Sequence, residues 1–407
     1  LLQRYAHNPV LTPADVPPSR DGYEVIGVFN AGAVRAGDEF ILLLRVAERP
    51  VQDDPGRIRI PLWDTAAGPP VAGELVLSLD DPGLDASDPR GVRYKGRDYL
   101  TSVSHLRVAR SRDGYRFTVD PEPALLPSAP YEAYGLEDPR ITPLGGGEYG
   151  VTYVAVSSWG IVTALATTRN FVRFERKGVI FHPENKNCVL FPNPSENGWL
   201  ALHRPDAGGL GDKTIWLSES PDGVHWGRHR PVMGLRPGMW DSVRIGAGAP
   251  PIRTDEGWLE IYHGVDDEGT YHLGAALLDL NDPGRVLARS AEPILSPAEP
   301  YETDGFFGNV VFTCGLAEAG DGRILVYYGC AGERMAVAEG RIDDILARLR
   351  EGRAGRAAGR RPGPAPGRYG VERRAPADKT RSSPSTSRTR TSDVSVRNVW
   401  LRLPMVR

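Results

Sequence analysis

Short apolar runs separated by polar turns make up most of the chain, and one kind of turn recurs at a regular interval. The turn residues are Asp113, Asn170, Asp222 and Asp282, at spacings of 57, 52 and 60 residues. Each turn joins two runs rich in β-branched and aromatic residues, which is the pattern of a β-hairpin. A further strand is clear at 39–44, so the stretch 24–80 leaves room for one more unit of the same kind.

A period in the fifties with several short strands per unit is typical of a β-propeller, in which each unit forms one blade. The four turns and the stretch 24–80 together predict five blades. We therefore expect an all-β fold, a five-bladed β-propeller over residues 1–350. A short helix is predicted only at its end, over 341–350, where Ile342, Ile345, Leu346 and Leu349 recur at helical spacing.

Charge divides the 407-residue chain into two parts. Residues 351–407 carry 14 Arg or Lys against 4 Asp or Glu, a net charge of +10, which leaves residues 1–350 with 35 basic and 48 acidic side chains, a net charge of −13. The last part is rich in Arg, Gly, Pro and Ser and lacks apolar periodicity, so we expect a disordered basic tail over 351–407. Such a tail can contact nucleic acid or an anionic membrane, but we favour an extension without function. The acidic body does not indicate nucleic-acid binding.

The cysteines and the apolar runs indicate the compartment. Cys188, Cys314 and Cys330 are odd in number and far apart, which argues against a disulfide framework and for a reducing environment. No apolar run is long enough to cross a bilayer, and no signal-peptide pattern follows Leu1. We therefore expect a cytoplasmic protein that does not bind membranes. No cluster of His, Cys or carboxylate residues has ligand spacing, so no metal is expected.

The densest charged motif is Gly-Leu-Glu-Asp-Pro-Arg at 135–140. Proline restricts the residue before it to extended or turn conformations, so Asp138 is predicted to be held rigidly, with Arg140 on the same side of an extended segment. A rigid carboxyl beside a guanidinium is a candidate acid–base group. Read alone, such a turn is more often structural, so its role depends on the rest of the chain.

Polar side chains interrupt several runs that are otherwise apolar. Lys186, Arg204, Arg244 and His263 each stand where the pattern predicts burial, and they fall on consecutive units of the repeat. A single buried Arg usually pairs with a carboxylate, and a single buried His is usually a core residue. Four such residues on successive blades would instead converge on one axis and form an anion site, for which Arg and Lys suit phosphate.

These motifs resemble the mannoside phosphorylases of glycoside hydrolase family 130. The resemblance rests on Gly-Leu-Glu-Asp-Pro-Arg, the Phe-Pro and His-Arg-Pro segments, the Gly-x-Gly-x-Pro-Pro-Ile run and Tyr-His-Gly-Val, and it spans about Asn8 to Leu349. It implies a five-bladed propeller, in agreement with the repeat. It also implies the reaction: inverting, reversible cleavage of a β-mannoside by inorganic phosphate to give α-D-mannose 1-phosphate, with no cofactor besides this co-substrate.

The resemblance assigns roles to single residues. Asp138 matches the sole catalytic acid. Asn30, Arg45 and Tyr271 match positions near the bound sugar, and Lys186, Arg204, Arg244 and His263 match the positions that hold phosphate. Two residues depart from the family pattern: Arg244 stands where a Lys is usual, and Gly332 stands where many members have an Asp that holds the sugar, with Glu333 as a candidate substitute.

Three functions therefore remain to be weighed. An ordinary inverting glycosidase needs a second carboxyl as base, whereas phosphate is already a nucleophile and needs none. In a strand, Glu137 would point away from Asp138, so we expect it to be structural, which favours the phosphorylase. The alternatives are a β-mannoside hydrolase on the same fold and a non-catalytic sugar-binding propeller. The linkage (1,2 or 1,4), the acceptor and whether the protein forms a homo-oligomer stay open.

Overall fold

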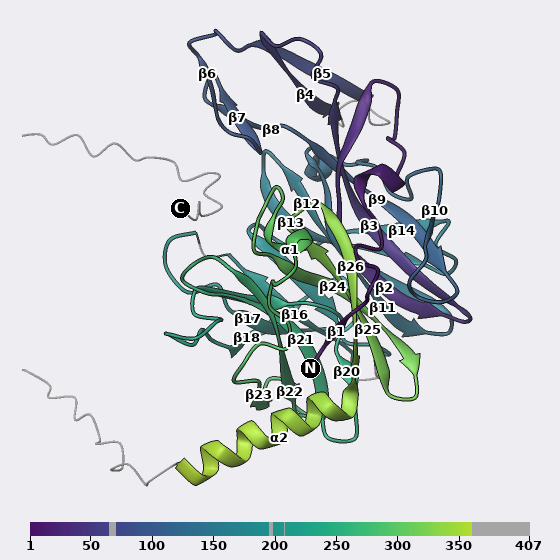
Figure 1. Cartoon of the computed structure of the whole chain (residues 1–407), viewed down its shortest axis with the longest axis vertical. Coiled ribbons are helices and arrows are strands. Elements are labelled where there is room, and N and C mark those ends of the chain that lie inside the picture. Colours follow the sequence, from purple (N-terminus) through teal and green to yellow (C-terminus); the bar gives the residue numbers. More distant parts are fainter. Residues whose placement is uncertain (65–70, 195–197, 207, 360–407) are drawn as a thin grey trace, which may run out of the picture.

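The computed structural model describes residues 1–64, 71–194, 198–206 and 208–359 of the chain (Figure 1). Antiparallel strands dominate these residues, and the last of them form one long helix. The prediction of an all-β protein is confirmed. The short helical segments are 3₁₀ turns η1 (Pro13–Asp15) and η2 (Pro130–Glu132) and the single turn α1 (Pro300–Thr303).

The largest sheet consists of two antiparallel runs of four strands. The first run is β2 (Tyr23–Ala36), β3 (Glu39–Pro50), β9 (Val103–Ser111) and β10 (Thr118–Val119). The second run is β11 (Gly135–Gly145), β12 (Glu148–Ser157), β13 (Gly160–Thr168) and β14 (Phe174–Phe181). A single parallel pair, Gly135 with Ser104, joins the two runs into one sheet.

Three further sheets follow along the chain. One is β15 (Asn185–Leu190), β16 (Trp199–Pro205), β17 (Ile215–Ser220) and β18 (Gly227–Met233). The next is β19 (Arg244–Ala247), β21 (Trp258–Val265), β22 (Tyr271–Leu278) and β23 (Val286–Arg289), with β20 (Ile252–Arg253) paired to β21. The last is β24 (Val311–Gly320), β25 (Arg323–Cys330) and β26 (Arg334–Arg341), completed by the N-terminal strand β1 (Gln3–Arg4).

The predicted turns occupy the same place in four of these runs, between the third and fourth strands. Asp113, Asn170 and Asp222 each accept hydrogen bonds through Oδ1 from the backbone N–H groups two and three residues later, at 2.8–3.0 Å. These are Asx turns, which explains the residue types. Asp282 lies in the equivalent connection from β22 to β23. The repeat is confirmed, and the run β24–β26 lacks this turn because its fourth strand, β1, comes from the other end of the chain.

The position expected for the fifth unit was wrong. We placed it in the stretch 24–80, but β2 and β3 belong to the same run as the Asp113 turn, and the remaining unit is the C-terminal one. The error arose because an insertion splits the first run between β3 and β9. The insertion forms two small sheets, β4 (Arg57–Asp64) with β5 (Val71–Ser78), and β6 (Leu84–Asp88), β7 (Gly91–Tyr94) and β8 (Arg97–Leu100).

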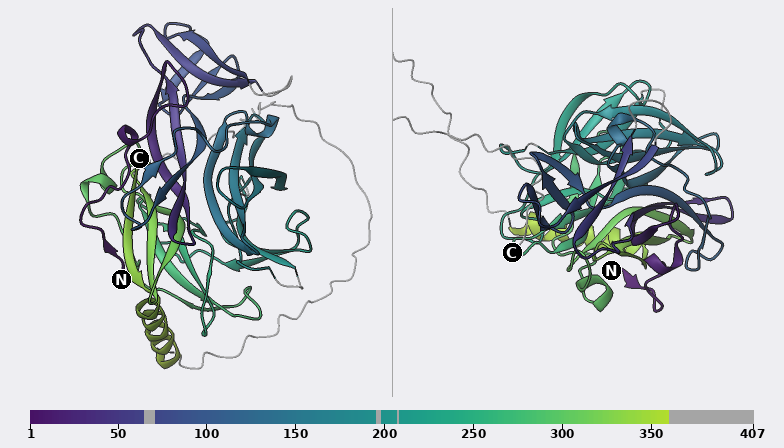
Figure 2. Two further views of the ribbon diagram at one scale, coloured as in Figure 1. Left: turned by 90° about the vertical axis from the view of Figure 1, so that its right-hand side faces the viewer. Right: turned by 90° about the horizontal axis from the view of Figure 1, so that it is seen from above.

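This inserted lobe projects at one end of the molecule, opposite the C-terminal helix (Figures 1 and 2). It has a small core of its own, in which Ile60, Leu77 and Val92 are buried. The larger cores lie between the sheets, and their strands supply mainly Val, Ile, Leu and Ala. The lobe is therefore an addition to a body whose packing is between neighbouring sheets.

The C-terminal helix α2 (Ile342–Gly359) confirms the helix predicted over 341–350 but continues beyond it. Ile345, Leu346 and Leu349 are buried against the core that contains β25 and β26. The boundary predicted between body and tail was thus too early, since residues 351–359 continue the helix. The rest of the predicted tail, 360–407, lies outside the described residues. No helix in the described part of the chain is long and apolar enough to cross a membrane.

Candidate active site

Arg45 on β3 binds two adjacent carboxylates of β11. Its Nη1 donates to Asp138 Oδ1 at 3.0 Å, and its Nη2 donates to Glu137 Oε1 at 2.7 Å. Its Nε donates to Ser104 Oγ at 3.1 Å, and the guanidinium carbon lies 4.6 Å from the centre of the Phe29 ring. Ser104, Phe29 and the two carboxylates therefore fix the position of the guanidinium, and the guanidinium fixes the positions of both carboxylates.

The prediction that Glu137 points away from Asp138 was wrong. A β-bulge interrupts the pairing of β11 with β12 between Glu137 and Arg140, and Asp138 has φ of +46° instead of the extended conformation expected before a proline. A bulge breaks the alternation of side chains, so consecutive carboxylates reach the same guanidinium. Left-handed backbone at a residue other than glycine is strained, and such strain concentrates at functional sites.

The two carboxyls titrate differently although they share Arg45. Burial raises the pKa of both, and at Glu137 this effect prevails, helped by the charge of Asp138. At Asp138 the charges of Arg45 and Arg140 and a hydrogen bond from Asn30 outweigh burial, so its pKa is lowered. The side chains remain 22% and 14% exposed, so a ligand can reach them.

Asn30 on β2 completes the surroundings of Asp138. Its Nδ2 donates to Asp138 Oδ1 at 2.9 Å, the same oxygen that Arg45 contacts. Asn30 and Arg45, both predicted to lie near the sugar, are therefore within hydrogen-bond distance of the candidate acid. The consecutive strands β2 and β3 and the distant strand β11 bring these three side chains together.

The structure also brings together Lys186, Arg204, Arg244 and His263, which we call the cationic cluster. Lys186 and Arg204 are cross-strand partners on β15 and β16, and Arg244 and His263 lie on the neighbouring strands β19 and β21. Burial, followed by the charges of Arg204, Arg140, Arg244 and Lys186, holds the pKa of His263 well below its usual value. His263 is therefore neutral, which corrects the expectation of four cations: the cluster has three cations and one neutral imidazole.

None of the three cations of the cluster is directly paired with a carboxylate among the described residues, although Asp206 acts electrostatically on Lys186 and Arg204. Among the described residues, the side chains of Lys186, Arg204 and Arg244 form no hydrogen bond and no ion pair. Nε of Arg204, Nε of Arg244 and Nδ1 of His263 are buried without a partner. Other buried atoms without partners occur at Arg107, Arg230 and Glu260, each of which makes a hydrogen bond through another atom, and at both ring nitrogens of His105. Buried charge without a partner is costly, so this cluster is suited to an anionic ligand.

Burial and repulsion by neighbouring cations lower the pKa of two members of the cluster, Lys186 and Arg204. The pKa of Lys186 is lowered by burial and then by Arg204, and burial lowers the pKa of Arg204 to about 10. Glu137 and Asp138 act on Lys186 in the opposite direction, which places the two carboxylates within electrostatic reach of the cluster. The acid and the cations therefore face one shared site.

Tyr271 on β22 lies with the cationic cluster and not with Asp138. The Arg244 guanidinium carbon is 5.6 Å from the centre of its ring, and the His263 ring stacks at 6.2 Å. Its backbone N–H donates to the carbonyl of Asn309 at 3.0 Å. Of the three residues predicted near the sugar, Tyr271 is thus the one that lies beside the cationic cluster.

Arg140 links the two halves of the site, a role that the sequence did not reveal. We expected its guanidinium beside the Asp138 carboxylate. Instead Nη1 donates to the Asp138 carbonyl at 2.7 Å, Nη2 donates to Asn187 Oδ1 at 3.1 Å, and Nε donates to the Gly248 carbonyl at 3.3 Å. Arg140 was visible in the motif, but Asn187 carried only the weak signal of an amide inside an apolar run.

Gly332 adopts φ of +73°, and a Cβ there would lie 3.2 Å from Cδ2 of Phe307. An Asp at this position would be strained and crowded by the ring. Glu333, the candidate substitute, directs its carboxylate to Arg334 Nη2 at 3.1 Å. The structure therefore gives neither residue the role of the sugar-holding Asp.

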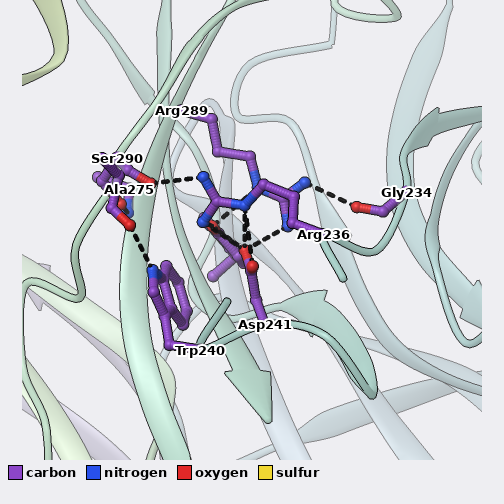
Figure 3. Close-up of polar contacts among 9 residues, drawn as sticks. Gly234, Arg236, Trp240, Asp241, Ala275, Arg289 and Ser290 are labelled. Atoms are coloured by element: carbon purple, nitrogen blue, oxygen red, sulfur yellow. Dashed lines mark hydrogen bonds and ion pairs between the residues drawn. The ribbon is translucent and has the colours of Figure 1, made fainter. Parts of the chain in front are cut away.

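A second arginine cluster, in which Arg236 and Arg289 are paired with the buried Asp241, precedes Arg244 in the chain (Figure 3). Arg236 donates to the Asp241 carboxylate through Nε and Nη2 at 2.6–3.0 Å, and Arg289 Nη2 donates to it at 2.5 Å. The Tyr262 hydroxyl donates to the same carboxylate at 2.9 Å. This Asp241 cluster anchors the segment that leads into Arg244. Within the described residues, no group of three or more His, Cys, Asp or Glu could hold a metal ion.

Comparisons with known proteins agree with the arrangement. A model of glycoside hydrolase family 130, described as beta-1,4-mannooligosaccharide phosphorylase, matches residues 86–351. A beta-1,2-mannobiose phosphorylase from Listeria innocua serovar 6a is 46% identical over 355 residues, which cover 86% of this chain and 98% of that protein. A 1,2-beta-oligomannan phosphorylase from Thermoanaerobacter sp. is 40% identical over 61% of this chain and 82% of its own length. The solved structure of the Listeria innocua enzyme with beta-1,2-mannobiose has a TM-score of 0.81 and 45% identity, covering 86% of this chain and 99% of the other.

Proposed function

The chain belongs to glycoside hydrolase family 130, and on that basis we propose that it cleaves a β-mannoside with inorganic phosphate by inverting phosphorolysis. The observation that carries this proposal is the cationic cluster. Lys186, Arg204 and Arg244 form no side-chain hydrogen bond or ion pair among the described residues, and Arg204 and Arg244 are buried. Lys186 lies within electrostatic reach of Glu137 and Asp138, the two carboxylates that Arg45 binds. Cations that have no carboxylate bonded to them, next to a candidate acid, suit a reaction in which phosphate is the nucleophile.

In this mechanism the cluster binds phosphate and orients one of its oxygens toward the anomeric carbon of the mannoside. The new bond from this carbon to the phosphate oxygen forms as the bond to the leaving sugar breaks on the opposite face. The leaving oxygen takes a proton that originates from Asp138, passed through a hydroxyl of the mannose. The products are α-mannose 1-phosphate and a shortened acceptor, so the reaction is formally a transfer of a mannosyl group to phosphate.

Asp138 has to hold a proton to act as the acid, although its pKa is lowered in the free protein. The lowering follows from Arg45 and Arg140. A phosphate dianion in the cationic cluster adds negative charge nearby, and the sugar excludes water from the carboxyl. Both effects raise a carboxyl pKa. Phosphate and mannoside binding would therefore prepare the acid, and the free protein would keep it ionised.

We propose a β-1,2 linkage for the substrate. The support is that the two relatives described above, at 46% and 40% identity, are named for β-1,2-linked mannosides, and the first matches over 98% of its length. The description of the family model names a β-1,4 linkage, so both linkages belong in the test. The β-mannoside hydrolase is less favoured because it has no use for the cluster, and the non-catalytic alternative leaves the bulged Asp138 unexplained.

The five-bladed propeller is part of the same proposal. The support is the ring of contacts among the runs: β2 contacts β24 and β11, β11 contacts β15, β15 contacts β19, and β24 contacts β21 and β22. Pairing of β1 with β26 would then close the last blade with strands from both ends of the chain. The cytoplasmic location, the homo-oligomer and the absence of a cofactor stay predictions.

The synthetic direction tests the proposal. The protein is incubated with α-mannose 1-phosphate and, in turn, mannose, glucose, N-acetylglucosamine, β-1,2-mannobiose and β-1,4-mannobiose, and phosphate release is measured. We expect release that depends on the acceptor and is fastest with mannose or β-1,2-mannobiose. Phosphate release that is independent of any acceptor, or no release with all of them, would contradict the assignment.

A further inference from the structure

Asn187 on β15 lies between Arg140 and His263 and contacts both through its side-chain amide. Arg140 Nη2 donates to Asn187 Oδ1 at 3.1 Å, and Asn187 Nδ2 lies 3.5 Å from His263 Nε2. All three residues are at most 2% exposed. Because a guanidinium can only donate, the oxygen of the amide must face Arg140, and its NH₂ group must face His263.

The orientation of this amide decides which nitrogen of His263 carries the proton. An NH₂ group donates, so His263 Nε2 has to be the acceptor, and the proton of the neutral ring is on Nδ1. Nδ1 is one of the buried atoms that have no hydrogen-bond partner among the described residues. The ring therefore has one free N–H donor, at the nitrogen that does not contact Asn187.

We propose that Arg140 and Asn187 are positioning residues that hold His263 in its Nδ1–H tautomer, so that a neutral N–H donor is presented to the anion of the cationic cluster. The identification of this anion as phosphate rests on the proposed function. The tautomer itself rests only on the three side chains and their contacts.

The tautomer matters because His263 is not protonated twice. Burial and the neighbouring cations keep its pKa well below the usual value, so the ring has a single N–H. With the proton on Nδ1 this group can donate to a phosphate oxygen. With the proton on Nε2, the lone pair of Nδ1 would face that oxygen and repel it. The position of this one proton therefore decides whether His263 donates a hydrogen bond to phosphate or repels it.

The same guanidinium also fixes the acid. Arg140 Nη1 holds the Asp138 carbonyl at 2.7 Å, inside the bulge that turns this carboxylate toward Arg45. Arg140 therefore sets the backbone position of the proton donor and, through Asn187, the orientation of a phosphate donor. Alignment of acid and nucleophile on opposite sides of one carbon is what an inverting displacement requires.

Gly246 on β19 leaves the space in which this contact fits. A Cβ at Gly246 would lie 2.4 Å from Asn187 Nδ2 and 2.5 Å from His263 Cε1. The backbone of β19 therefore presses directly against the amide and the ring. Little room is left for either side chain to rotate, which keeps the chosen tautomer in place.

The first test is nitrogen-15 NMR of the full chain with labelled histidine. The chain has eight histidines, and the His263 signals are identified by their loss in His263→Gln. At about pH 7.5 we expect the wild-type Nδ1 to be protonated and Nε2 to be the bare nitrogen. Asn187→Asp places a carboxylate oxygen against Nε2, so the proton should move to Nε2. A wild-type ring protonated on Nε2 would overturn the proposal, and this spectrum needs no Asn187 variant to fold.

The second test separates positioning from general stability by steady-state kinetics in both substrates. Asn187→Asp should raise the KM for phosphate about tenfold or more, as expected when a hydrogen bond to a charged ligand is lost, and change the KM for β-1,2-mannobiose less than about threefold. The matched control is Asn185→Asp on the same strand, since Asn185 Nδ2 contacts His203 Nδ1 at 2.9 Å outside the cluster. The control should leave the phosphate KM within about twofold. Equal effects of the two substitutions on the phosphate KM would contradict the proposal that Asn187 positions His263.

The two tests distinguish failure of the tautomer proposal from failure of the proposed function. If the turnover rate does not depend on phosphate but the wild-type His263 ring is protonated on Nδ1, the phosphorylase assignment is wrong and the tautomer proposal stands. If turnover depends on phosphate but the ring is protonated on Nε2, only the tautomer proposal is wrong.

Discussion

Two arginine clusters lie on opposite sides of β21, and they differ in charge balance. In the Asp241 cluster, one buried carboxylate accepts hydrogen bonds from Arg236 and Arg289 (Figure 3). It also accepts one from the Tyr262 hydroxyl. In the cationic cluster, Arg204, Arg244 and Lys186 have no carboxylate bonded to them among the described residues. Tyr262 and His263 are consecutive on β21 and so face opposite sides of the strand, one toward each cluster.

The comparison shows that this fold supplies a carboxylate where arginines have a structural role. Asp241 is fully buried and ties the segment before β19 to β21 through Tyr262 and to β23 through Arg289. A few residues away, the same sheet leaves Arg244 without such a partner. Leaving these cations without a bonded carboxylate lowers the stability of the folded protein, and binding of an anion would offset that loss. The absence of a counter-ion is thus more informative about function than the presence of the cations.

The largest expected effect is on folding. Asp241→Asn leaves Arg236 and Arg289 without their buried charge partner, so we expect the free energy of unfolding to fall by about 3–5 kcal/mol. Denaturant unfolding measures it. The control is Asp282→Asn, which removes a surface ion pair with Arg230 and should cost less than about 1 kcal/mol. An Asp241→Asn protein as stable as this control would contradict the claim that Asp241 is the structural charge partner of Arg236 and Arg289.

The opposite result is expected in the cationic cluster. Arg204→Met removes repulsion and buried charge, so the free energy of unfolding without phosphate should stay equal or rise. The KM for phosphate should increase about 10- to 100-fold, since hydrogen bonds to a charged ligand are lost. Phosphate should also raise the melting temperature of the wild type more than that of the variant. A destabilised Arg204→Met protein with unchanged phosphate KM would show that Arg204 is structural.

A smaller effect concerns pH. The folded-state pKa of His263 lies well below 6.5, so the unfolded chain binds a proton below about pH 6.5 that the folded protein does not. Stability from His263 is therefore present above this pH and is lost as the pH falls. Between about pH 6 and about pH 5, the wild type should lose up to about 1.4 kcal/mol per pH unit more than His263→Gln. Parallel stability curves for the two proteins would contradict a neutral, buried His263.

The sequence predicted the β class, the repeat and the members of the site from local signals. Asx turns report hairpins through a single residue, and a lysine or arginine in an apolar strand is conspicuous without knowledge of its neighbours. The number of units was also deduced, but the inserted lobe between β3 and β9 shifted the position of the first one. The inserted strands have the same residue pattern as the strands of the repeat, so the local sequence does not distinguish the insertion from a repeat unit.

The remaining errors concern backbone geometry and partners distant in the sequence. The bulge at Asp138 reverses the orientation expected for Glu137, and a proline after Asp138 gave no sign of a left-handed residue. Arg140 contacts a carbonyl and an amide far along the chain, which residue spacing cannot reveal. The neutral state of His263 follows from burial among three-dimensional neighbours and could not be deduced from residue type.

The central claim is that the unpaired cations are a phosphate site serving one acid, and the fate of β-1,2-mannobiose tests it most directly. The protein is incubated with this disaccharide with and without inorganic phosphate, and the products are identified by proton and phosphorus-31 NMR, with Asp138→Asn as the blank. We predict α-mannose 1-phosphate and mannose in equal amounts, formed only when phosphate is present and not by the blank. Release of two mannose molecules at the same rate without phosphate would contradict the account.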